Sequence, residues 1–131
     1  MERVKFKNIF IGTTSILFYF LNNLLFKKIS FQPVKYLFEC YFNDMLASIV
    51  ILAFANFMLF KYSKQITKIK YILLFVFCCG CVWEFVAPLY KPNSVIDLFD
   101  FIAYFIGGSI YYIIIQAKSS YSKIHTKQNI S

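Results

Sequence analysis

The chain has few of the residues on which most catalytic and nucleotide-binding sites depend. Its single histidine, His125, lies near the carboxyl terminus, and its four glycines form no Gly-rich phosphate loop. A histidine in a polar tail excludes a Ser/His or Cys/His nucleophile arrangement inside the fold. Cys78, Cys79 and Cys81 lie together, but no second Cys or His cluster could complete a tetrahedral metal site. These cysteines therefore fit small packing residues best, and no cofactor is expected.

Acidic residues are also scarce, since six Asp and Glu stand against fourteen Lys and Arg, for a formal net charge of +8. The lysines lie in gaps between apolar runs and form no basic face with interleaved aromatics, which argues against a nucleic-acid partner. Apolar residues are abundant: 60% are hydrophobic, 21% are aromatic, and the mean hydropathy is +0.62. Soluble domains are about 45–50% apolar. The composition therefore predicts a multi-pass membrane protein in contact with the lipid bilayer.

Four apolar runs could cross a hydrocarbon core of about 30 Å at about 1.5 Å per residue. We expect one domain over 1–131, an all-α integral membrane bundle of four transmembrane helices. The helices are expected at about 8–26, 41–60, 71–87 and 95–115, with a polar, mobile tail at 118–131. The first run is longer than a signal-peptide core and lacks an A-x-A-like cleavage site, so we expect it to be retained. Residues 27–42 are expected to connect two spans, and Pro88 to end the third helix at Ala87.

Basic residues are unevenly distributed over the connections. Ten lie in the amino-terminal segment, the 61–70 loop and the carboxyl-terminal tail, which share one side of a four-helix bundle, and four lie on the other side. The positive-inside rule therefore predicts that both termini are cytoplasmic, in the plasma (cell inner) membrane. Four acids then lie toward the outer leaflet: Asp44, Glu84, Asp97 and Asp100.

Acids inside apolar spans call for an explanation, because inserting one at the centre of a membrane helix costs roughly 2.5 to 3.5 kcal/mol on insertion scales. Glu84 is the first functional candidate, since Gly80 and Cys81, one turn away on its own face, leave room beside it. The alternative is an interfacial glutamate that points outward or pairs with Lys91. For Asp44, with Ser48 one turn on, a functional role and simple interface placement both remain open.

Along the last expected helix, polar and small residues recur at spacings of three and four: Asp97, Asp100, Tyr104, Gly107 and Tyr111. Such a stripe faces protein or water. Ala103 and Gly107 form a small-xxx-small pair that allows a neighbouring helix to approach closely. Asp97 fits a capping box with Ser94 as the N-cap, whereas Asp100, one turn deeper, is a functional candidate.

The connection between the last two helices is short, which predicts an antiparallel helix hairpin. Glu84 and Asp100 are each about one turn inside their helices. We therefore expect their carboxyl groups to lie within a few ångströms of each other. Two carboxyl groups at such a short distance, in a poorly hydrated site, should resist being ionised at the same time.

The order of these residues resembles the VanZ-like family of small membrane proteins. That family has a glutamate late in one helix, a basic residue in a short outer loop, and an aspartate and a glycine in the last helix. The matching residues here are Glu84, Lys91, Asp100 and Gly107. The departures are Lys91 for the usual arginine, Ala87 for a glutamine, Tyr104 for an asparagine, and a loop about one residue longer.

The wider pattern E…P…D..D…Y..GG, with YFND opening the second span, also looks like a subgroup sometimes labelled magnesium citrate secondary transporters. The resemblance covers roughly the second half of the chain. It implies the same helical fold and a role at the cell envelope, because VanZ-like proteins are best known for low-level resistance to the glycopeptide teicoplanin. Fold transfers more safely than function in such a comparison.

Three functions remain open. The first is a non-enzymatic protein whose outward-facing site binds an envelope component, such as a lipid, or a cationic small molecule; its residues would be Glu84, Asp100, Asp44, Lys91 and Tyr104. The second is a small ion-coupled transporter in which Glu84 and Asp100 carry a proton or cation. The third is an enzyme acting on lipid-linked substrates with a metal held by the carboxylates. Transport predicts a mid-membrane acid and repeated halves, and the absence of both from the sequence favours binding.

Overall fold

The structure is a computed structural model that describes residues 2–25, 28, 32–93 and 97–128. Within these residues it is helical and contains no strand. The elements are α1 (Glu2–Leu25), α2 (Gln32–Leu37), the π-helical turn η2 (Phe38–Phe42), α3 (Asn43–Phe60), α4 (Ile69–Tyr90) and α5 (Leu98–Gln128).

Four helical stretches are long and apolar enough to cross a membrane: Lys5–Leu25, Gln32–Phe60, Ile69–Tyr90 and Leu98–Ala117. The prediction of an all-α chain with four candidate spans is therefore confirmed.

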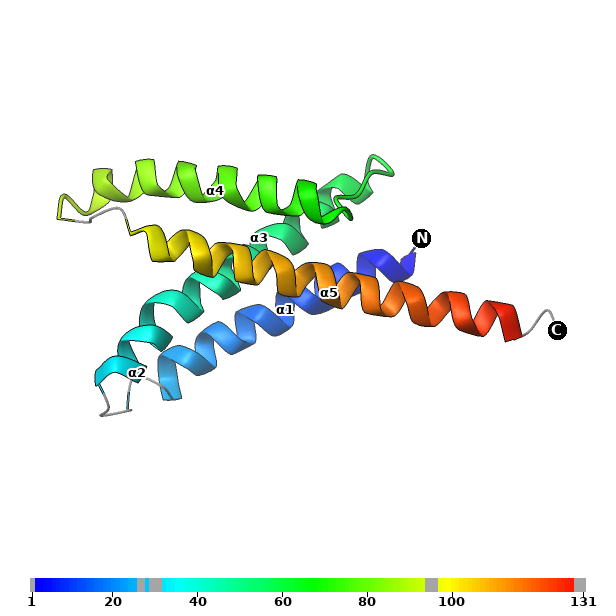
Figure 1. The fold of residues 1–131 in the computed structure, drawn as a ribbon, viewed down its shortest axis with the longest axis horizontal. Helices are drawn as coiled ribbons and strands as arrows, with labels where there is room; N and C mark the ends of the chain where they lie inside the picture. The colour runs from blue at the N-terminus through cyan, green and yellow to red at the C-terminus, as the bar shows by residue number, and fades with distance from the viewer. Residues whose placement is uncertain (1, 26–27, 29–31, 94–96, 129–131) are drawn as a thin grey trace.

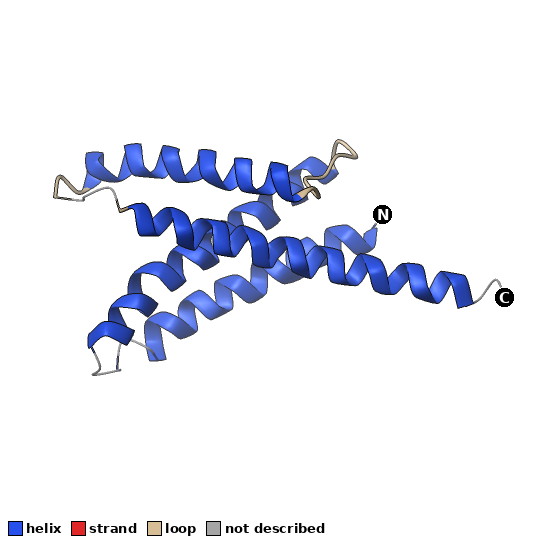
Figure 2. Ribbon diagram, viewed as in Figure 1, coloured by secondary structure: helices blue, strands red, loops and turns tan. Residues whose placement is uncertain are grey.

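The helices pack as two pairs joined through α5. α1 lies along α3, and α4 runs beside α5 in the opposite direction (Figures 1 and 2). α3 and α5 form the third large interface, whereas α3 and α4 touch only sparsely. The described ends of the chain lie at the same end of the bundle as the connection between α3 and α4 (Figure 1). The ends of α1 and α4 lie at the opposite end.

The core lies where α3, α4 and α5 meet. Its buried residues are Ile49, Leu52, Ala53, Ile72, Val76, Tyr104 and Tyr111. Outside this core many large apolar side chains are exposed, including Phe20, Phe54 and Phe85. Such a surface would be a liability in water. It is the expected surface of helices that face lipid.

Small residues set the distance between the helices. A Cβ added at Gly107 would overlap Ser48 Oγ and the Met45 carbonyl oxygen on α3. A Cβ at Gly80 on α4 would lie 3.0 Å from the ring of Tyr104. The predicted close approach is therefore confirmed at Gly107, where α3 is the helix that approaches, and Ala103 is buried.

A buried polar network ties three helices together. Asn56 donates to the Tyr111 hydroxyl at 2.6 Å, and that hydroxyl donates to Asn8 Oδ1, also at 2.6 Å. Asn56 also bonds the backbone of Ile66, accepting from its N–H at 2.7 Å and donating to its carbonyl at 3.1 Å. Asn8, Asn56 and Tyr111 are all nearly inaccessible. The network thus fixes α1, α3, α5 and the 61–68 connection against one another.

Three helix boundaries differ from the sequence expectation. α4 continues through Pro88 to Tyr90, and its last turn closes with the Lys91 N–H donating to the Ala87 carbonyl at 2.9 Å. α2 and η2 extend the second span into the expected connection, with Pro33 in the first helical turn, where it is tolerated. α5 continues to Gln128 through the expected tail, since no Gly or Pro interrupts it after Gly108.

Candidate functional site

A cavity of about 1070 Å³ lies between η2, α3, α4 and α5, toward the end of the bundle where α4 stops and α5 begins. We call it the acidic cavity. Its lining includes the four acids Glu39, Asp44, Asp97 and Asp100. In the part of the chain that the structure describes, Lys91 is the single basic residue that lines it. The cavity therefore carries an excess of carboxylates over cations.

Asp44 and Asp100 come together across the α3–α5 interface. Each stands in the first turn of its helix, and the close contact of Gly107 with Ser48 brings these helices near each other. Their carboxyl groups lie within hydrogen-bonding reach of each other. Because a carboxylate only accepts hydrogen bonds, a bond between the two needs one shared proton.

Asp97 has a structural role as the cap of α5. Its Oδ1 accepts the backbone N–H of Phe99 at 3.0 Å, and its Oδ2 accepts the Tyr41 hydroxyl at 3.1 Å. The helix begins at Leu98, so Asp97 is itself the N-cap and not the third helical residue of a capping box. Ser94, the expected N-cap, lies outside the described residues.

Glu84, the first candidate from the sequence, is not among the residues that line the acidic cavity. It is half-buried on α4. The expected antiparallel hairpin of α4 and α5 is present, and Glu84 interacts electrostatically with Asp100, but the carboxyl group within hydrogen-bonding reach of Asp100 belongs to Asp44. The alternative pairing of Glu84 with Lys91 is not formed, since Lys35–Glu39, at 4.0 Å, is the one carboxylate–lysine ion pair among the described residues.

Aromatic side chains supply much of the remaining wall. Tyr104 lines the cavity at 7% exposure and interacts electrostatically with Asp44, Asp100 and Glu84. Tyr36 and Trp83 also line it, and both are more than half exposed. An aromatic face beside carboxylates is a favourable environment for an organic cation.

The cysteines are single thiols on η2 and α4. Cys78 and Cys79 line the acidic cavity, and all four cysteines are free. Among the described residues, no group of three or more His, Cys, Asp or Glu side chains is arranged to hold a metal ion.

Glu39 is the lining acid that the sequence interpretation missed. It lies five residues before Asp44, a spacing that a regular α-helix does not place on one face. The π-helical turn η2, whose bonds join residues five apart, lies between them and brings both into the same cavity. One signal in the sequence could have pointed to Glu39. Lys35 and Glu39 are four residues apart, the spacing of an ion pair on a helix, in a segment that was expected to be a connection.

Comparison of the chain with protein-family models, with curated proteins and with solved structures returns no match.

Proposed function

We propose that the chain is a non-enzymatic membrane protein whose acidic cavity binds a ligand with an organic cationic group. The observation that carries this proposal is that four carboxylates and one lysine line a single cavity. Opposite charges about 4 Å apart attract by about 4 kcal/mol at an effective dielectric constant near 20. The aromatic walls favour an ammonium group over a bare metal ion, because cation–π attraction adds to the carboxylate field.

The cavity size supports a small-molecule ligand. Its volume of about 1070 Å³ is near the upper end of the roughly 300–1,000 Å³ typical of ligand pockets. Val82 and Trp83 line the cavity and are both more than half exposed, which supports access from the lipid side. The resemblance to VanZ-like proteins supports an envelope component or a cationic envelope-active compound as the natural ligand.

Neutralising either Asp44 or Asp100 should abolish most of the ligand binding. We expect Asp44→Asn and Asp100→Asn each to weaken the binding of benzyltrimethylammonium by at least about tenfold, about 1.4 kcal/mol. Lys91→Gln should strengthen it, because the competing cation is removed. Trp83 is the only tryptophan and lines the cavity, so its fluorescence in nanodiscs reports binding directly.

Asp97→Asn is the matched control for this test. It removes one lining charge, but asparagine is also a good N-cap, so α5 keeps its first turn and binding falls only modestly. Glu84→Gln should have an intermediate effect, since Glu84 interacts electrostatically with Asp100 but does not line the cavity. Two results would contradict the proposal. The parent could bind the uncharged tert-butyl analogue of the probe as tightly as the probe itself, or Asp44→Asn and Asp100→Asn could both leave the affinity for the probe unchanged.

A proton-coupled transporter is the second candidate, and one observation favours it: Asp44 and Asp100 lie within reach of sharing a proton, inside two candidate spans. A binding protein and a transporter differ in proteoliposomes. Only a transporter accumulates the labelled cation against its gradient when a proton gradient is imposed, and Asp100→Asn should remove that accumulation.

We further propose that both termini are cytoplasmic and that the acidic cavity faces outward in the plasma membrane. The support is the excess of Lys and Arg at the end that carries the chain ends and the 61–68 connection. With native cysteines replaced, a cysteine at Asn93 should react with an impermeant thiol reagent on whole cells, and one at Ser63 should not. The reverse labelling pattern would overturn this orientation.

A further inference from the structure

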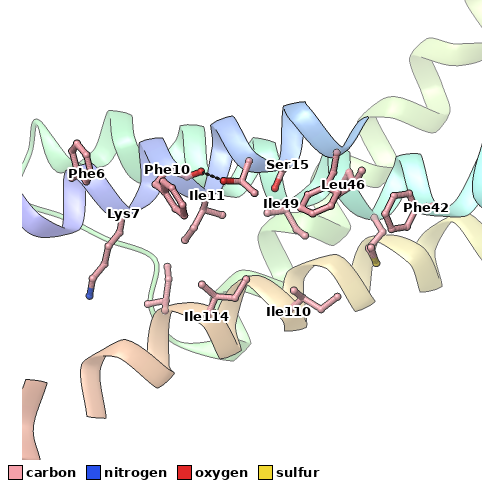
Figure 3. A pocket seen from close by; sticks show the side chains of 14 residues that line it. Phe6, Lys7, Phe10, Ile11, Ser15, Phe42, Leu46, Ile49, Ile110 and Ile114 are labelled. Atoms are coloured by element: carbon pink, nitrogen blue, oxygen red, sulfur yellow. Dashed lines mark hydrogen bonds between the residues drawn. The ribbon is translucent and has the colours of Figure 1, made fainter. Parts of the chain in front are cut away.

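A second, apolar groove lies between α1, α3 and α5, apart from the acidic cavity. It has a volume of about 610 Å³ and a floor of buried Leu46 and Ile49. Its sides include Phe10 and Phe18, which are at least half exposed, so the groove is open to the surroundings of the bundle. Figure 3 shows that Phe6 and Lys7 lie at one end and Phe42 at the other.

Among the described lining residues, the polar side chains of the groove are Lys7 and two single hydroxyls, those of Thr14 and Ser15. Thr14 lines it, but its hydroxyl donates to the Phe10 carbonyl at 2.7 Å, the dashed line in Figure 3. Among the described residues that line the groove, Lys7 is the only charged one. An occupant must therefore be apolar over most of its length and anionic at the end where Lys7 lies.

The dimensions of the groove match one leaflet of a bilayer. The lining residues of α1 run from Phe6 to Phe18, which at about 1.5 Å per residue is about 18 Å. Half of a hydrocarbon core is about 15 Å. Lys7 lies close to the start of the candidate span Lys5–Leu25, where lipid headgroups begin.

We propose that this groove holds an acyl chain of an anionic phospholipid, with the lipid phosphate bound by Lys7. The basic end of the bundle complements the charge of that headgroup, since Lys7 shares it with the lysines of the 61–68 connection. The proposal is independent of the acidic cavity, because the two lining sets share no residue. It also requires no particular orientation in the membrane.

The test is native mass spectrometry of the full chain after delipidation and addition of phosphatidylglycerol or phosphatidylcholine. The parent should retain phosphatidylglycerol preferentially. Lys7→Gln should reduce that preference about fivefold, which corresponds to about 1 kcal/mol per lysine near a membrane surface. Ile114→Trp, which fills the groove from α5, should reduce retention of both lipids.

Two neighbouring positions provide matched controls. Lys5→Gln removes the same charge from the same helix, but Lys5 stands over the Phe57 ring at 5.6 Å and does not line the groove. Ile113→Trp adds the same bulk at an exposed residue outside the groove. Both variants should retain lipid like the parent.

Equal retention of the two lipids by the parent would overturn the proposal, as would equal behaviour of Lys7→Gln and Lys5→Gln. Lipid-free dimers that Ile114→Trp dissociates would assign the groove to a second copy of the chain, and would overturn it as well.

Discussion

Replacing Gly107 by alanine should destabilise the bundle by about 3 kcal/mol, the upper end of the usual cost of overpacking a core. The added Cβ would overlap both Ser48 Oγ and the Met45 carbonyl oxygen. The backbone carbonyl cannot rotate away, and Ser48 is itself held by its 2.8 Å bond to that carbonyl. α3 and α5 must therefore separate to admit a single methyl group.

Gly12→Ala is the control for this substitution, because its Cβ would meet only Ala53 Cβ at an ordinary 3.5 Å. Alanine is the better helix former by up to about 1 kcal/mol, so this variant should be neutral or slightly more stable. Thermal unfolding of both variants in one detergent, followed by circular dichroism and Trp83 fluorescence, measures the difference. Equal midpoints would show that the α3–α5 contact is looser than described.

Asn56→Ala should cost about 2–4 kcal/mol of unfolding free energy. The substitution leaves the Ile66 N–H and carbonyl without their side-chain partner and takes one bond from the Tyr111 hydroxyl. Each buried polar group that loses its partner costs about 1–3 kcal/mol. Hydrogen bonds between membrane helices are worth about 0.6 kcal/mol on average, so the unpaired groups dominate the cost.

Tyr111→Phe should be milder than Asn56→Ala, since Asn56 keeps both bonds to Ile66. Asn23→Ala should be nearly silent, because Asn23 makes one exposed bond to the Tyr19 carbonyl at 3.1 Å. A double-mutant cycle of Asn56 and Tyr111 should give a coupling of about 1 kcal/mol. Additive losses in that cycle would mean that the 2.6 Å bond between them contributes nothing to stability.

The four spans were predictable because hydrophobicity and length are local properties of the sequence. Helix ends were less predictable, since proline's bias against a helical preceding residue is statistical: α4 continues through Pro88 to Tyr90. The π-helical turn before α3 has no comparable local signal in the sequence. Its effect is to bring Glu39 into the acidic cavity from a segment expected to be a connection.

Most residues of the candidate site were predictable from the sequence, but which carboxyl groups pair with each other was not. Asp44, Asp100, Lys91 and Tyr104 were expected from sequence and do line one cavity. The expected partner of Asp100 was Glu84, because consecutive helices were assumed to supply the pair. Which carboxyl group reaches Asp100 depends on the packing of α5 against α3, which the Gly107 contact sets.

The buried network was outside the reach of sequence reasoning for a similar reason. Asn8 and Tyr111 are separated by 103 positions in the chain, and Asn56 and Tyr111 by 55. Each residue alone is an ordinary small or amphipathic side chain in an apolar run. Only the assembled bundle shows that the three share one hydrogen-bonded chain.

Because α3 and α4 contact each other only sparsely, the walls of the acidic cavity differ in stiffness. Asp44 and Asp100 stand on α3 and α5, which are held together by a large interface and by the Asn56–Tyr111 bond. The facing wall belongs to α4, which is held chiefly by α5. A small tilt of α4 would widen the cavity without moving the charged pair. If the cavity binds a cation as proposed, its charge is the fixed property of the site and the size of the ligand it accepts is the adjustable one.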